Sequence, residues 1–146
     1  MLDNRSAAVA LWSNLDAIQE VRDIMVRKVV SARPSASLME IARLMRKNRI
    51  GSVIITKGRK PAGILTESDF IKLVARGCDM KNGLAEDHMN RNVVTCDASI
   101  TVIDALMIMR GEKIRHLPVV KNANLVGIVS IRDLIAATQF SSFYVI

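Results

Sequence analysis

The chain is poor in aromatic residues, cysteine and proline. Its 146 residues include one Trp, one Tyr, three Phe, three Pro and two Cys. So few aromatic residues supply no stacking motif of the kind used by proteins that bind single-stranded nucleic acid. Cys78 and Cys96 lie in neither a CxxC pair nor a Cys/His zinc spacing, so we expect no disulfide framework and no metal site. A reducing, cytoplasmic location is the natural expectation.

Long hydrophobic runs are missing as well. The apolar stretch at residues 7–12 is too short for a signal sequence or a membrane span, so we expect neither export nor membrane insertion. Yet 50% of the residues are hydrophobic, enough to bury a core. The length suits one compact domain, or two small repeats that share a core.

Positive charge is concentrated in the first half of the chain. The net charge is +7, and residues 21–80 hold thirteen Lys and Arg against five Asp and Glu, whereas residues 85–139 hold six against six. Such a field favours an anionic partner: the phosphates of a small nucleotide, a nucleic acid or an acidic protein surface. A merely solubilising surface is the alternative, and charge alone does not choose among these.

The sequence repeats itself at an offset of 64 residues without gaps. Asp23-Ile-Met25 falls on Asp87-His-Met89, Met45-Arg46 on Met109-Arg110, and Gly63-Ile64 on Gly127-Ile128. Repeated units of this size bury their hydrophobic faces against one another. We therefore expect two equivalent halves that pack about a pseudo-two-fold axis.

Each half has the same local pattern. Short β-branched segments at 29–31 and 93–95 precede turn residues, and Ser37 and Thr101 start helices with a carboxylate three positions later. A hairpin is predicted in each half, from an apolar run, a polar turn and a second apolar run: 50–56 and 62–65 in the first half, 114–120 and 125–129 in the second. A second helix follows each hairpin. The fold class predicted is α/β, with two tandem β-α-β-β-α repeats.

The segments outside the repeats are apolar. Ser6–Glu20 has apolar residues at helical spacing, which predicts an amphipathic helix that packs on the core or on a partner. Residues 140–146 form an apolar tail that should be tied down or lie in an interface. The expected organisation is an N-terminal helical segment (1–20), repeat 1 (21–80), repeat 2 (85–139) and the tail (140–146).

One element stands out in both halves: Gly63-Ile-Leu-Thr66-Glu-Ser-Asp69 and Gly127-Ile-Val-Ser130-Ile-Arg-Asp133. A glycine lets a backbone approach a ligand, and a helix N-terminus with a hydroxyl can bind phosphate. A carboxylate three residues after the hydroxyl can accept from both ribose hydroxyls. The alternative is a capping box, in which the carboxylate only caps its own helix.

With Ile114-Arg-His-Leu-Pro-Val-Val120 and the Asp-x-Met openings, residues 20–138 resemble tandem CBS domains, the Bateman module. The resemblance implies a regulatory module that binds an adenosine nucleotide (AMP, ADP, ATP or a related ligand) in the cleft between repeats. The nucleotide-binding residues implied are Val29, Ser31, Ile50, Ser52, Gly63, Thr66, Ser68, Asp69, Val93, Thr95, Ile114, Arg115, His116, Pro118, Gly127, Ser130, Arg132 and Asp133.

The two halves differ at the phosphate-binding position. Arg115-His116 stands where the family places basic residues that contact phosphate, whereas the first half has Gly51-Ser52 there. Equal occupancy of two sites is therefore not expected. A structural role remains the alternative for His116. Core filling is the favoured role of Met25, Met39, Met45, Met107 and Met109.

No nucleophile with a base, catalytic carboxylate pair or metal cluster appears at recognisable spacing, so we expect a binding protein and not an enzyme. A free-standing pair must act through another chain or through a change of assembly, and a homodimer is expected. The alternative function is the binding of nucleic acid or an acidic partner by the basic first repeat. The sequence does not name the regulated partner.

Overall fold

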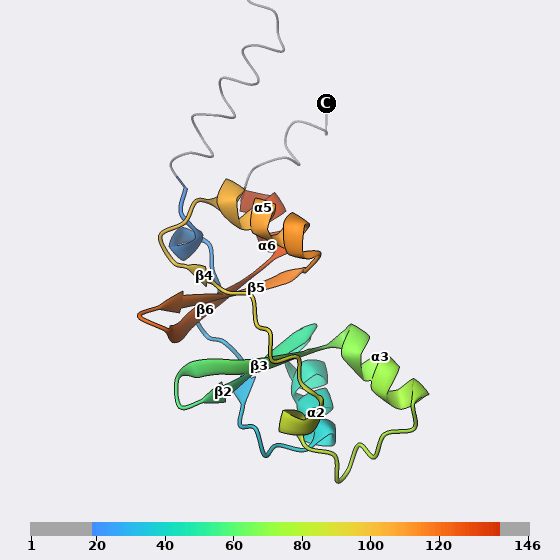
Figure 1. Ribbon diagram of the computed structural model, residues 1–146. Coiled ribbons are helices and arrows are strands. Elements are labelled where there is room, and N and C mark those ends of the chain that lie inside the picture. Colours follow the sequence, from blue (N-terminus) through green and yellow to red (C-terminus); the bar gives the residue numbers. More distant parts are fainter. Residues whose placement is uncertain (1–18, 138–146) are drawn as a thin grey trace, which may run out of the picture. The chain divides into compact units, whose positions relative to one another are not determined.

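The computed structural model describes residues 19–137, drawn in colour in Figure 1. Most of the predicted N-terminal helix and the whole apolar tail lie outside the described residues. Glu20, the last residue of that helix prediction, has an extended backbone with φ −95° and ψ 156°. It forms an isolated antiparallel bridge with Thr101, so the helical expectation is wrong at this position.

Both repeats have the predicted β-α-β-β-α order. The first consists of β1 (Ser31–Ala32), α2 (Leu38–Asn48), β2 (Ser52–Lys57), β3 (Lys60–Thr66) and α3 (Glu67–Ala75). The second consists of β4 (Cys96–Asp97), α5 (Val102–Glu112), β5 (His116–Lys121), β6 (Asn124–Ser130) and α6 (Ile131–Ala137). Two short helices precede the repeats: η1 (Val21–Asp23) and α4 (Ala85–His88). The sequence reading missed both.

Each repeat has its own three-stranded sheet, in the order β1-β2-β3 or β4-β5-β6. β1 runs parallel to β2, with Ser31 opposite Ile54, and β2 runs antiparallel to β3, with Ser52 opposite Thr66. β4 pairs with β5 in the same parallel sense, Cys96 opposite Val119. The first strands are shorter and later than predicted, since Val29, Val30, Val93 and Val94 serve as connections and not as ladder residues.

Side-chain caps fix the beginnings of the long helices. The Ser37 hydroxyl accepts from the Glu40 N–H at 3.1 Å, and the Thr101 hydroxyl accepts from the Asp104 N–H at 3.1 Å. At the other end, Arg49 and Lys113 follow α2 and α5 in the left-handed region, with φ of 53° and 55°. Their N–H groups donate to carbonyls of the last turn, which ends each helix and turns the chain into the next strand.

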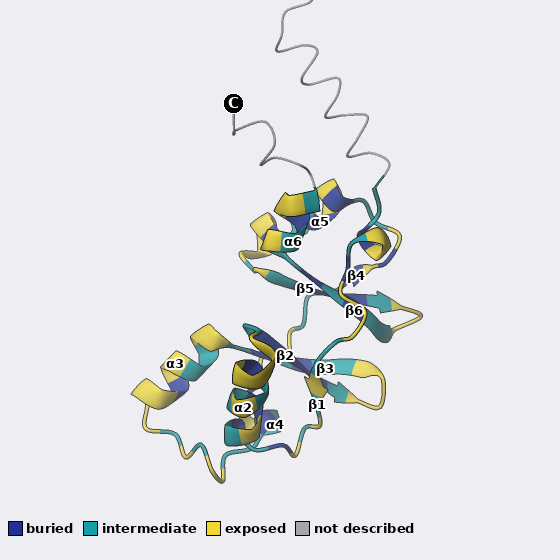
Figure 2. Cartoon of the chain, turned by 180° about the vertical axis from the view of Figure 1, so that it is seen from behind, coloured by how far each residue is buried: buried dark blue, intermediate teal, exposed yellow. Residues whose placement is uncertain are grey.

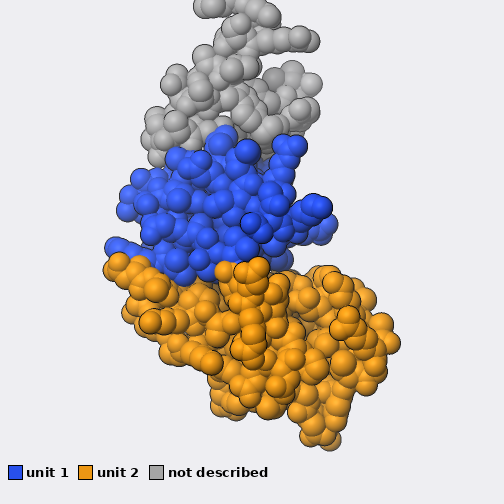
Figure 3. Space-filling view, in the orientation of Figure 1, with its two compact units in different colours: residues 1–27, 94–121, 126–146 blue, residues 28–93, 122–125 orange. Residues whose placement is uncertain are grey.

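The chain divides into two compact units (Figure 3). Of the described residues, unit 1 contains 19–27, 94–121 and 126–137, and unit 2 contains 28–93 and 122–125. The Val26 N–H donates to the Ile128 carbonyl at 2.9 Å inside unit 1. In unit 2, the Ile64 N–H donates to the Asn90 carbonyl at 3.0 Å. Each sheet therefore carries the segment that precedes the other repeat in sequence.

In unit 1, α5 and α6 lie on one face of the sheet, and in unit 2 α2 does so, with the apolar sides of these helices in the core (Figures 1 and 2). α3 contributes the buried Leu73. Leu38 and Ile41 of α2 are fully buried with Leu65 of β3, and Val102, Ala105 and Leu134 are fully buried in unit 1. Met25, Met45 and Met109 are buried as expected. Met107 is 62% exposed, so the core role predicted for it is wrong. Its neighbour Ala105, two residues before, occupies the inner face of α5 instead.

Two glycines of the repeated motif pack against methionines of these exchanged segments. A Cβ at Gly127 would overlap the sulfur of Met25 and lie 2.8 Å from its Cγ, and a Cβ at Gly63 would lie 2.5 Å from the Met89 Cγ. The packed methionines therefore leave no room for a side chain at either glycine. The sequence reading gave these glycines to a ligand, and the structure gives them a packing role.

Candidate functional site

The motif residues of the first repeat gather at one end of its sheet. Because β1 and β2 are parallel, Ser31 and Ser52 lie at the same end, and the antiparallel pairing puts Thr66 opposite Ser52. The Glu67 N–H donates to the Gly51 carbonyl at 3.1 Å, which joins the start of α3 to the loop before β2. Strand starts, a strand end and a helix N-terminus thus meet in one place within unit 2.

Asp69 caps the helix that begins there. Its Oδ2 accepts from the Thr66 N–H at 2.9 Å and from the Thr66 hydroxyl at 3.0 Å, and its own N–H donates to that hydroxyl at 3.4 Å. The capping box is therefore formed. Both bonds to the carboxylate end on Oδ2. Within residues 19–137 no hydrogen bond ends on Oδ1, whose lone pairs suit the hydroxyls of a ribose.

The second repeat forms the same arrangement in unit 1. The Ser130 N–H donates to Asp133 Oδ2 at 3.2 Å, and the Asp133 N–H donates to the Ser130 hydroxyl at 3.2 Å. Asp69 and Asp133 are half-buried, so each carboxylate has an outer side that a ligand can reach. The capping role and a ribose-binding role can therefore coexist at both positions.

The basic residues of the second repeat lie beside this helix start. The Arg115 carbonyl accepts from the Ile131 N–H, the first of α6, at 2.9 Å. Arg115 is exposed and His116, the first residue of β5, is half-buried and has an interaction partner. In the first repeat the carbonyl of Gly51 makes the equivalent bond. Arg115 and Gly51 therefore occupy equivalent positions in the two repeats, and only the second repeat has a basic side chain there.

The other predicted residues differ in how far a ligand could reach them. Val29, Ile50, Ile114 and Thr95 are half-buried, and Ser31, Ser68 and Arg132 are exposed. Ser52 and Pro118 are buried, which leaves their side chains little contact with solvent. Val93 is half-buried at the end of the 28–93 segment of unit 2, whereas Thr95 belongs to unit 1.

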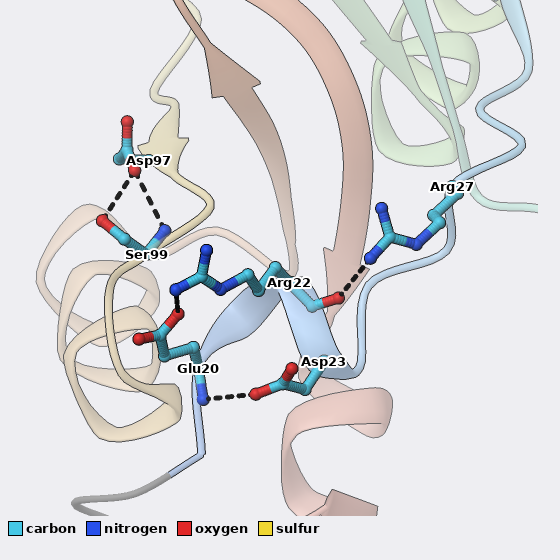
Figure 4. A network of polar contacts seen from close by, with 6 residues as sticks. All are labelled: Glu20, Arg22, Asp23, Arg27, Asp97 and Ser99. Carbon is cyan, nitrogen blue, oxygen red and sulfur yellow. Dashed lines mark hydrogen bonds and ion pairs between the residues drawn. The ribbon is translucent and has the colours of Figure 1, made fainter.

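A second polar cluster, around η1, is structural (Figure 4). Arg22 forms an ion pair with Glu20, and the Arg27 guanidinium donates to the Arg22 carbonyl at 3.0 Å. Asp97 accepts from the Ser99 N–H at 2.9 Å and from its hydroxyl at 2.7 Å. The backbone bond from Ser99, followed by its hydroxyl, lowers the pKa of Asp97. These polar groups bond to other groups of the same chain, and the bonds hold η1 and the turn after β4 in place.

One pocket in unit 2, here named the α2–α3 pocket, was not predicted from the sequence. It is lined by Ala42, Met45, Arg46, Arg49, Ile50 and Glu67 and has a volume of about 480 Å³. The available signal was the repeated pair Met45-Arg46 and Met109-Arg110, which had served only to establish the repeat.

Across residues 19–137, no group of three or more His, Cys, Asp and Glu side chains could hold a metal ion. In the same part of the chain no helix is long and apolar enough to cross a membrane.

Comparison with known proteins gives concordant matches. The family model of the CBS domain matches residues 21–76 and 85–139. An uncharacterized protein of Methanopyrus kandleri is 36% identical over 82% of this chain, and the match spans 63% of that protein's length.

Two solved structures are similar at fold level and carry bound ligands. A CBS domain protein of Pyrobaculum aerophilum, complexed with AMP, is 33% identical with a TM-score of 0.74, over 78% of this chain and 88% of that one. The CBS domain pair of protein MJ0100, in complex with 5′-methylthioadenosine and S-adenosyl-L-methionine, is 29% identical with a TM-score of 0.76, over 86% and 98%.

Proposed function

Because this chain belongs to the CBS-domain family and carries two CBS domains in tandem, we propose that it is a regulatory module that binds an adenosine nucleotide. The observation that carries the proposal is the doubled Thr/Ser–Asp motif, which in each unit begins a helix that is joined by a backbone hydrogen bond to the residue before β2 or β5. Similar structures bind AMP, or S-adenosyl-L-methionine and 5′-methylthioadenosine, which all contain adenosine. The adenosine part is therefore the ligand group these residues would recognise.

Each part of the proposed ligand has a matching group. Asp69 and Asp133 would accept from ribose hydroxyls through Oδ1. The half-buried Val29, Ile50, Val93 and Ile114 would cover the base, and the backbone at Ser31 and Thr95 would bond to its edge. Arg115 would hold phosphate in a bidentate manner, with His116 beside it. Since Gly51 and Ser52 replace that pair in the first repeat, phosphorylated ligands would favour the second-repeat residues.

The module would act by binding and not by catalysis. A bound nucleotide can change a surface or an assembly only if it binds the two states with different affinity. Exposed apolar side chains on the helices support a homodimer as the assembling species: Ile71 is 72% exposed and Val74 is 64% exposed on α3, and Ile135 is 46% exposed on α6. AMP, ADP, ATP and S-adenosylmethionine are all candidate ligands.

A second candidate function rests on the basic surface of the first repeat. Arg43, Arg46, Lys47 and Arg49 of the α2 region are exposed, as are Lys57, Arg59 and Lys60 at the β2–β3 turn. These seven cations would suit a nucleic acid or an acidic protein.

A thermal-shift screen of adenosine, AMP, ADP, ATP and S-adenosylmethionine tests the proposal. At least one ligand should raise the melting temperature in a concentration-dependent manner, because binding to the native state alone stabilises it. The matched comparison is Asp69→Ala with Asp133→Ala, which should abolish the ligand-dependent part of the shift. If none of the five raises the melting temperature of the parent, the adenosine proposal is wrong.

A further inference from the structure

The α2–α3 pocket combines both signs of charge with an apolar surface. Arg46 and Arg49 contribute two guanidinium groups from the end of α2, and Glu67, the first residue of α3, contributes one carboxylate. Ala42, Met45 and Ile50 supply the apolar part of the lining. Its volume of about 480 Å³ is within the range of small-molecule sites.

The pocket's charges do not neutralise one another. Within the described part of the chain, the one ion pair joins Arg22 to Glu20, so Arg46, Arg49 and Glu67 are in no ion pair although they line the same pocket. Arg46 lies in the last turn of α2 and Arg49 is the left-handed residue that follows the helix, and both line the pocket. A guanidinium fork matches a carboxylate in shape and charge. The pocket therefore offers a place for an anionic group and, separately, for a cationic one.

The apolar lining is accessible enough to receive a side chain. Ala42 and Ile50 are half-buried, and Met45 is 7% exposed and forms the deep part of the lining. Methionine adapts its shape to different apolar partners. A ligand of one charge alone would leave part of this lining unmatched: a phosphate would be repelled by Glu67, and an amine by the arginines.

We propose that this pocket binds a free α-amino acid with an apolar side chain, as a second effector besides the nucleotide. The ligand carboxylate is held by Arg46 and Arg49, its ammonium group by Glu67, and its side chain contacts Met45 and Ile50. Ile50 is also in the residue set proposed to contact the base, whereas Arg46, Arg49 and Glu67 are not. The two ligands therefore need not compete for charged groups.

The second repeat lacks one component of this set. At the offset of 64 residues, Met109, Arg110, Lys113 and Ile114 correspond to Met45, Arg46, Arg49 and Ile50, but Ile131 stands where the first repeat has Glu67. The equivalent surface of unit 1 can attract a carboxylate but offers no partner for an ammonium group. One amino-acid site per chain is therefore expected.

Amide-resolved NMR titration with L-leucine tests the proposal, because it measures weak binding and locates it. Leucine should shift the amides of Arg46, Arg49, Ile50 and Glu67 in a saturable way, with a dissociation constant of about 1 mM, the scale expected for an open, solvated site. 4-Methylpentanoate lacks the ammonium group and 3-methylbutylamine lacks the carboxylate. Each should bind about fivefold more weakly than leucine.

Four variants identify the groups responsible. Arg46→Ala and Arg49→Ala should each weaken leucine binding about fivefold, whereas Arg43→Ala, a matched loss of an exposed α2 arginine outside the pocket, should leave it unchanged. Glu67→Gln should weaken leucine but strengthen 4-methylpentanoate, because it removes the repulsion between two carboxylates. A merely structural role of Glu67 would not produce these opposite signs.

Two results would overturn the proposal. One is the absence of saturable shifts at roughly 20 mM leucine, about twenty times the expected dissociation constant. The other is binding that Arg46→Ala and Glu67→Gln leave unchanged. Neither result bears on the nucleotide proposal, since adenosine ligands are assayed separately on the same parent protein.

Discussion

At the scale of single residues, the aspartates of the repeated motif have two roles that can be separated. Asp69→Ala and Asp133→Ala should each lower the free energy of unfolding by about 1 kcal/mol, because each removes a helix cap. The same variants should also weaken adenosine ligands, by up to a few kcal/mol, through lost charge-assisted hydrogen bonds. Chemical denaturation and calorimetric titration measure the two effects.

Ser37→Ala and Thr101→Ala are the matched controls. They remove a capping hydroxyl, instead of a capping carboxylate, from the start of α2 and α5, helices that begin away from the motif. They should lower stability by a similar amount and leave nucleotide affinity unchanged. If the two aspartate variants and the double variant bind as the parent does while unfolding more easily, the aspartates are caps alone.

The glycine–methionine contacts form a second residue-scale prediction. Gly127→Ala should lower the free energy of unfolding by about 1–3 kcal/mol, because its Cβ would overlap Met25. Met25→Ala should also destabilise, through lost core contacts. Combined, the two substitutions should cost less than their sum, because the second removes the overlap created by the first. Additive costs in urea denaturation would contradict this contact.

At the scale of elements, β4 places a thiol in the core of unit 1. Cys96 is 5% exposed, and burial, followed by the nearby carboxylate of Asp97, raises the pKa of its thiol to about 11. Because the folded-state pKa is above the unfolded one, the thiol's contribution is full below about pH 9 and is lost as pH rises through about 11.

Cys96→Ala removes this titration. The parent's free energy of unfolding should therefore fall more steeply than the variant's between about pH 8 and pH 10.5, by a difference on the order of 1–2 kcal/mol. Urea denaturation of both proteins across this range measures it. Parallel curves would show that the Cys96 thiol titrates alike in the folded and unfolded states.

The order of elements was predictable because local patterns repeat. Ser37 and Thr101 mark helix starts, and paired apolar runs mark the hairpins, so both motifs were assigned to the correct strand ends and helix N-termini. The strand β1 was misplaced, since the ladder it joins is set by contacts with β2 and not by its own valines. The exchange of residues 21–27 and 84–93 between repeats was also beyond local pattern, because it depends on long-range packing of Met25 and Met89.

The candidate site was predictable to the same degree. The motif predicted two roles for its aspartate, a helix cap and a ribose ligand. The structure contains the cap and leaves the second carboxylate oxygen free of hydrogen bonds within residues 19–137. The glycine role was not predictable, because Met25 is about 100 residues from Gly127 in sequence. The α2–α3 pocket was missed because Glu67 and Arg46 come together only through the tertiary fold.

At the scale of the whole molecule, the exposed apolar helix residues predict self-association. The parent should scatter light as a dimer at tens of micromolar, and Ile71→Glu should shift it toward the monomer, because a carboxylate would be buried without a partner. Lys72→Glu changes an exposed neighbour on α3 and serves as the control, which should remain dimeric. A monomeric parent, with and without nucleotide, would contradict the assembly part of the proposal.

The net positive charge of the chain suits two kinds of anionic partner, a nucleic acid and a mononucleotide, and their salt dependence distinguishes them. A nucleic acid would displace many counterions, so its affinity should fall by orders of magnitude between low and physiological salt. A mononucleotide brings one to three phosphates to a few groups, so its affinity should depend only weakly on salt. Arg115 would contact phosphate alone, which makes it the residue that reports on a phosphorylated ligand.

The most direct measurement is calorimetric titration of adenosine, AMP, ATP and a short oligonucleotide at two salt concentrations, for the parent and Arg115→Ala. We expect saturable binding of at least one mononucleotide, with an affinity that depends only weakly on salt. Arg115→Ala should weaken AMP and ATP but spare adenosine. Tight, salt-sensitive binding of the oligonucleotide with no detectable binding of adenosine, AMP or ATP would contradict the nucleotide proposal and favour a nucleic-acid-binding role for the basic first repeat.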